Sequence, residues 1–63
     1  MGKVEDEILR LLGEGTPLTL IEISERLGKK PKTVFRSLRK LFEKGKIVSD
    51  PRTRTYTLAE DEE

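Results

Sequence analysis

The sequence predicts a mainly α-helical domain in which three helices precede a small β-hairpin. Three segments repeat apolar residues at the spacing of one helical face, and glycines and prolines separate them. The final segment is rich in β-favouring residues around an Asp-Pro turn, a pattern typical of two paired strands. The chain of 63 residues has room for one domain, which we expect over residues 1–59, with 60–63 as a disordered acidic tail.

The first helix is predicted from about Val4 to Leu12. Its apolar positions follow an i, i+4, i+7, i+8 pattern: Val4, Ile8, Leu11 and Leu12. Residues 5–7 are acidic, and because consecutive helical positions point in different directions we interpret them as helix-start charges rather than a metal site. Glycines at 13 and 15 should end the helix, and Leu18 should form a very short strand on the hairpin edge.

The second helix is predicted over Leu20–Leu27. Thr19 and Glu22 have the spacing of a capping box, in which each side chain bonds the other residue's backbone N–H. Gly28 follows at a position that favours a positive φ, and Pro31 suits the first turn of the next helix. A tight turn should therefore join the second and third helices.

The third helix is predicted over Pro31–Lys44, with Gly45 ending it. Its core face should comprise Val34, Leu38, Leu41 and Phe42. Phe35 lies one position off this stripe and is expected at the edge of the core; if exposed, it would mark an interaction surface. Lys30 stands at the N-cap, where Ser, Thr or Asp is usual, and a bound phosphate could take over the capping role.

The hairpin should begin at Ile47 and Val48, turn at residues 50–53 and return over Arg54–Leu58. Alternation places Tyr56 and Leu58 on one face, which we expect to pack inward.

Charge is strongly segregated although the chain carries only +1 overall. Residues 29–54 hold ten Lys and Arg against Glu43 and Asp50, a local net charge of +8, whereas both flanks are acidic. Such a basic middle segment favours a polyanionic partner.

Together these elements describe a three-helix winged helix-turn-helix, a fold whose third helix fits the DNA major groove. We predict a non-enzymatic module that binds double-stranded DNA with this helix and with the hairpin, the wing. The expected base readers are Thr33, Arg36, Ser37 and Lys40. The expected phosphate contacts are Lys29, Lys30, Lys32, Arg39, Lys44, Arg52 and Arg54.

Composition argues against other function classes. The chain has no Cys and no His, which removes thiolate chemistry, the usual zinc ligands and the commonest general base, so we expect no cofactor and no metal. No apolar run approaches the roughly 20 residues that span a bilayer, so we expect a cytoplasmic protein with no membrane partner. As a DNA-binding module it is expected to be nucleoid-associated.

The segment from Leu27 to Ile47, with its L-G, R-S-L, L-F-E-K-G-K-I run, resembles the core of winged-helix regulators such as the MarR and ArsR repressors. The resemblance covers roughly residues 18–58. It implies the winged-helix fold and, with it, DNA binding by the third helix and the wing.

The same run is similar to the Z-DNA-binding domains of RNA-editing deaminases. That family reads its ligand with an Asn and a Tyr, and the matching positions here are Phe35 and Arg39. Lys32 and Arg36 are retained, but the resemblance does not carry Z-DNA recognition to this chain.

A second function stays open at this point. Winged helices also serve as protein-interaction domains in replication, repair and transcription assemblies, where an acidic protein surface would be the partner. A homodimer, or attachment to a larger protein assembly, is a further alternative because one copy covers little DNA.

Overall fold

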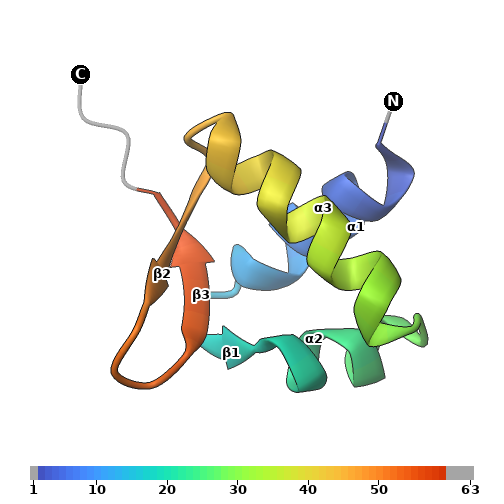
Figure 1. Ribbon diagram of the computed structural model, residues 1–63, viewed down its shortest axis with the longest axis horizontal. Helices are drawn as coiled ribbons and strands as arrows, with labels where there is room; N and C mark the ends of the chain where they lie inside the picture. Colours follow the sequence, from blue (N-terminus) through green and yellow to red (C-terminus); the bar gives the residue numbers. More distant parts are fainter. Residues whose placement is uncertain (1, 60–63) are drawn as a thin grey trace.

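The computed structural model describes residues 2–59 and shows three helices packed on a small antiparallel sheet (Figure 1). The helices are α1 (Lys3–Leu12), α2 (Leu20–Leu27) and α3 (Pro31–Glu43). The strands are β1 (Leu18–Thr19), β2 (Ile47–Asp50) and β3 (Thr55–Leu58). This arrangement confirms the predicted winged helix-turn-helix. The predicted acidic tail, residues 60–63, lies outside the described residues.

The sheet has the order β1-β3-β2, with both pairings antiparallel. Leu18 pairs with Tyr56 across β1 and β3, and Ile47 pairs with Leu58 across β2 and β3. The short strand predicted at Leu18 therefore exists, and it ties the wing to the segment that leads into α2.

One hydrophobic core joins the helices to the sheet. Eight apolar side chains from all three helices and from β1 and β2 are fully or almost fully buried: Ile8, Leu12, Leu18, Ile23, Val34, Leu38, Leu41 and Ile47. Val4, Leu11, Leu27 and Tyr56 pack around them at partial burial. Burial of this apolar set is what holds α3 in place.

The helix ends form as the local sequence requires. Thr19 and Glu22 make the complete capping box, with Thr19 N–H donating to Glu22 Oε1 at 2.9 Å and Glu22 N–H donating to Thr19 Oγ1 at 3.2 Å. Gly28 has φ +67°, so the chain turns sharply from α2 toward α3, as predicted. Gly45 has φ +74° and closes α3 in the same way.

Four predicted placements are wrong. Phe42 is 55% exposed and Phe35 is 48% exposed, because Leu38 and Leu41 already fill the core contact and the two rings fall on the helix flank that faces the wing. Leu58 is 38% exposed because it closes the strand at the margin of the core. Arg54 belongs to the turn rather than to the strand, with φ +57°.

Two helix ends shift by one residue. The first helix begins at Lys3, and α3 ends at Glu43 with Lys44 as its C-cap. Differences of this size are usual at frayed helix ends and change no face of either helix.

Candidate nucleic-acid interface

The turn at Gly28 sets α3 across α2 so that one face of α3 is held by the core and the other is free. Ile23 of α2 packs with Val34 and Leu38 of α3, and these three side chains are buried. Leu27 adds a partly buried contact. The helix α2 therefore braces α3, and α3 presents its outer face on a fixed support.

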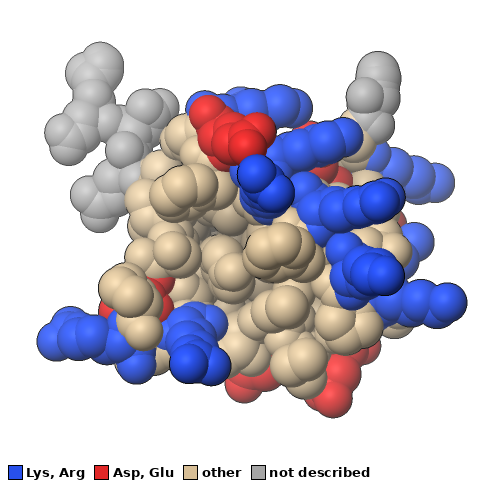
Figure 2. Space-filling model, in the orientation of Figure 1, with Lys and Arg blue, Asp and Glu red and all other residues tan. Residues whose placement is uncertain are grey.

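The outer face of α3 gathers most of the predicted site residues. A single shallow depression is lined by Thr33, Arg36, Ser37, Arg39, Lys40 and Glu43. Lys32, Arg36 and Lys40 are exposed, and Ser37 is partly buried. Figure 2 shows the resulting band of Lys and Arg side chains along α3. All four predicted base readers thus share one surface.

The N-terminus of α3 lacks a side-chain cap. Lys30 occupies the N-cap in extended conformation, makes no capping hydrogen bond, and no acidic residue lies in the first turn. Lys29 and Lys30 are both exposed. The first N–H groups of the helix, which no side chain caps, therefore lie next to two exposed lysines in the sequence, and such an end favours an anion.

Three of the predicted phosphate contacts are engaged in ion pairs. Arg39 Nε lies 3.4 Å from Glu43 Oε2 on the exposed face of α3. Lys44 Nζ lies 3.1 Å from Glu5 Oε1 and so links the end of α3 to α1. Glu5 is thus an ion-pair partner as well as a helix-start charge, and Lys44 is directed toward α1 rather than along the basic band.

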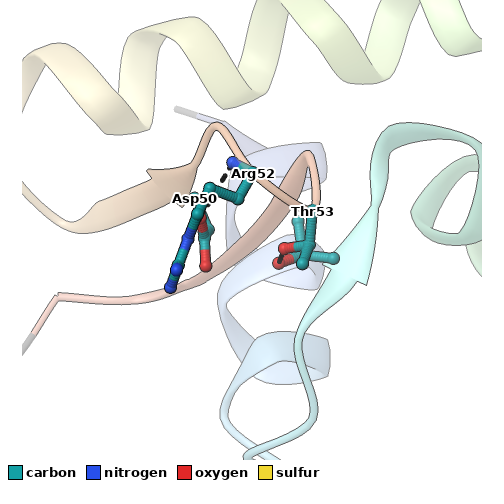
Figure 3. A network of polar contacts seen from close by, with 4 residues as sticks. Asp50, Arg52 and Thr53 are labelled. Atoms are coloured by element: carbon teal, nitrogen blue, oxygen red, sulfur yellow. Dashed lines mark hydrogen bonds and ion pairs between the residues drawn. The ribbon is translucent and has the colours of Figure 1, made fainter.

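The third ion pair joins Asp50, the last residue of β2, to Arg52 of the wing loop, residues 51–54 (Figure 3). Arg52 N–H donates to Asp50 Oδ1 at 3.0 Å, and Arg52 Nε lies 3.8 Å from the same oxygen. The hydroxyls of Thr53 and Thr55 are 2.8 Å apart, and Arg54 N–H donates to the Asp50 carbonyl at 2.6 Å. These contacts hold a compact loop that leaves the guanidinium of Arg52 open to solvent.

Sequence reasoning missed a hollow between α3 and the wing. It measures about 280 Å³ and is lined by Phe35, Leu38, Arg39, Phe42, Ser49 and Tyr56, a set we call the aromatic hollow. In Figure 2 it lies within the uncharged, indented surface between the blue side chains of α3 and those of the wing loop. Phe35 and Phe42 are seven residues apart, two helical turns, and this spacing was the available signal that they share a flank.

Residues 2–59 contain no group of three or more His, Cys, Asp or Glu side chains placed to hold a metal ion. In the same range, every helix is too short or too polar to cross a membrane.

Comparison with known proteins decides the family. The model of the IclR helix-turn-helix domain matches residues 7–51, which is most of the chain. The chain belongs to the IclR helix-turn-helix family. The predicted winged-helix relationship is thereby confirmed, but the MarR and ArsR repressors represent related families and the specific one is IclR. An IclR helix-turn-helix domain is a DNA-binding module of transcription regulators and is not an enzyme.

A solved structure agrees with this assignment. The chain is 36% identical to an IclR transcriptional regulator from Alicyclobacillus acidocaldarius, with a TM-score of 0.85 over 90% of the present chain. The match covers 24% of that regulator, so the chain spans about a quarter of its length. No curated protein matches the sequence.

Proposed function

We propose that this IclR-type domain binds double-stranded DNA with α3 in the major groove and the wing loop on the flanking backbone. The observation that carries the proposal is the shared surface of Thr33, Arg36, Ser37 and Lys40 on the free face of α3, whose opposite face is buried against α2 and the rest of the core. The major groove is wide enough to admit such a helix, and Arg and Lys bond guanine there.

The roles of the remaining cations follow from their positions. We assign Lys29 and Lys30, at the uncapped start of α3, to one phosphate, with Lys32 beside them. Arg52 and Arg54 reach a second stretch of backbone from the wing loop. Arg39 and Lys44 contribute less, because Glu43 and Glu5 compete with phosphate for them.

The small size of the domain bears on how it would assemble on DNA and where it would be found. A single small domain covers little DNA, so two copies, or a longer chain that pairs them, would read two half-sites. Association with chromosomal DNA, and hence with the nucleoid, is the corresponding location.

A salt titration tests the mode of binding. A labelled duplex of about 20 base pairs is titrated with the protein at several salt concentrations. If four or five phosphates are neutralised, the logarithm of the binding constant should fall with the logarithm of the salt concentration with a slope of about −4. Arg36 and Lys40 are two of the expected base readers, so replacing both by Ala should weaken binding; the loss of two positive charges from the face that meets the DNA should also make the salt slope shallower.

The matched control removes the same charge from another face. Arg10 and Arg26 are exposed and line a separate surface with Glu7 and Glu14, so their double Ala variant should leave the slope close to that of the parent. Equal losses in the two double variants would reject α3 as the reading helix. Absence of binding even at about 50 mM salt would favour the protein-interaction alternative, in which the exposed Phe35 is the contact.

A further inference from the structure

The aromatic side chains of this protein are gathered at one place. The chain contains two Phe, one Tyr and no Trp, and all three rings line the aromatic hollow. Two of these rings are about half exposed, at 48% for Phe35 and 55% for Phe42. Exposed aromatic rings that face one hollow indicate a ligand with a flat or apolar surface.

The aromatic hollow continues toward the wing loop. A second hollow of about 620 Å³ shares Phe35, Ser49 and Tyr56 with it and extends to the first residues of α2 and to Arg54. Together they form an open trough between α3 and the wing, and the larger hollow has the volume of a small-molecule site.

Charge on the trough favours a polyanion. Arg39 lines one end and Arg54 lines the other, and the surrounding segment 29–54 carries ten cations against two anions. Asp50 also lines the trough, but its carboxylate accepts the backbone N–H of Arg52 and lies beside the Arg52 guanidinium. Glu43 lies 3.4 Å from Arg39 in an exposed ion pair, so a phosphate at Arg39 has to displace this carboxylate. An acidic ligand therefore finds Arg54 at one end of an aromatic floor and, in competition with Glu43, Arg39 at the other.

We infer that this trough binds single-stranded DNA, with unpaired bases stacked on Phe35, Phe42 and Tyr56 and phosphates at Arg39 and Arg54. Aromatic rings set in a basic groove are the usual platform for single strands, because every base has a π-face. In a duplex the faces of the bases are covered by their neighbours and only the edges are open, so a duplex cannot use these rings in this way. This activity is separate from major-groove binding by the outer face of α3.

The inference is tested with an oligothymidine of about ten nucleotides, a length within the range of known single-strand sites. Tyr56 is the only tyrosine and the chain has no tryptophan, so intrinsic fluorescence reports on the aromatic hollow alone. Stacking should quench this fluorescence. An abasic oligomer of equal length supplies the phosphates and sugars without bases, and should bind weakly and leave the fluorescence unchanged.

The decisive variant is Phe35→Leu, which keeps an apolar side chain and removes the π-face. It should weaken binding of the oligothymidine by roughly 5- to 150-fold, the range measured for one stacked base, while duplex binding stays within about twofold. Val48→Ala is the matched control, because Val48 is a comparably exposed apolar residue that does not line the trough. Thermal unfolding of each variant verifies that it is folded.

Several results would overturn the inference. Equal affinity for the abasic oligomer would mean attraction by charge alone, and an unchanged affinity of Phe35→Leu would mean that no base stacks there. Quenching of Tyr56 by a duplex as strong as that by the single strand would assign the trough to duplex backbone. The result is independent of the Arg36 and Lys40 titration, so each proposal can fail without the other.

Discussion

Glu43 is the single acidic residue of α3, and it lies on the basic outer face. Its carboxylate is 3.4 Å from Arg39, and both side chains are largely exposed. An exposed pair of this kind adds little to stability, at most about 1 kcal/mol. Its larger effect is on charge, since Glu43 repels phosphate and occupies Arg39.

Glu43→Gln should therefore strengthen duplex binding at low salt. We expect a gain of about two- to fivefold and a salt slope that steepens by up to about 1, as Arg39 becomes available to phosphate. Titration of the labelled duplex at several salt concentrations gives both numbers. Glu14→Gln removes the same charge from a surface shared with Arg10 and Arg26, away from α3. If Glu14→Gln strengthened duplex binding as much as Glu43→Gln, the gain would come from the net charge of the protein and not from the position of Glu43 beside Arg39.

The elements differ in how their first turns are capped. The helix α2 has a complete capping box, whereas α3 begins at Lys30 with no side-chain cap. A lysine at the N-cap fits a helix whose first N–H groups are capped by a phosphate of the bound DNA instead of by a side chain of the protein. A protein capped by its own side chain would have less to gain from a phosphate at that position.

Lys30→Ser should separate stability from binding. A Ser N-cap should raise the free energy of unfolding by about 1 kcal/mol, measured by urea denaturation, while weakening duplex affinity. Lys30→Ala removes the ammonium without adding a cap, so it should weaken binding with no gain in stability. If the Lys30→Ser protein were no more stable than Lys30→Ala, the hydroxyl introduced at position 30 would not be accepting a hydrogen bond from the first N–H groups of α3.

Sequence reasoning succeeded for elements whose limits are set by local chemistry. The capping box at Thr19, the left-handed Gly28 and the bounds of α2 depend on residues a few positions apart, and they were all predicted. The predicted burial was wrong at Phe35, Phe42 and Leu58. Apolar spacing identifies one face of a helix or strand, but it does not give how much of that face a neighbouring element covers. The aromatic hollow depends on the gap between α3 and the wing, which is set by tertiary packing.

At the scale of the whole molecule, stability depends on few side chains. Eight buried apolar residues form the core, and a domain of this size buries a smaller fraction of its surface than a larger one. Small domains have total stabilities at the low end of about 5–15 kcal/mol. Loss of one large core side chain is therefore a substantial fraction of the total.

Leu38→Ala should cost about 2–5 kcal/mol and leave a large part of the population unfolded at 37 °C. Leu38 is 1% exposed and belongs to the core cluster, so its truncation removes buried apolar contacts. Ile8→Val removes one methyl group from a core position and should cost about 0.5–1.5 kcal/mol, which leaves the protein folded. Far-ultraviolet circular dichroism during heating compares the two. Similar losses would mean that the core is loosely packed.

The strand order β1-β3-β2 leaves β2 at an outer edge of the sheet. Unpaired backbone groups on such an edge can recruit a strand from another molecule. Here the edge is four residues long, follows the charged Lys46, ends at Asp50 and is interrupted at once by Pro51. Short length, charge and proline are the features that discourage strand addition. The wing can therefore stand out from the body of the protein without acting as a seed for aggregation.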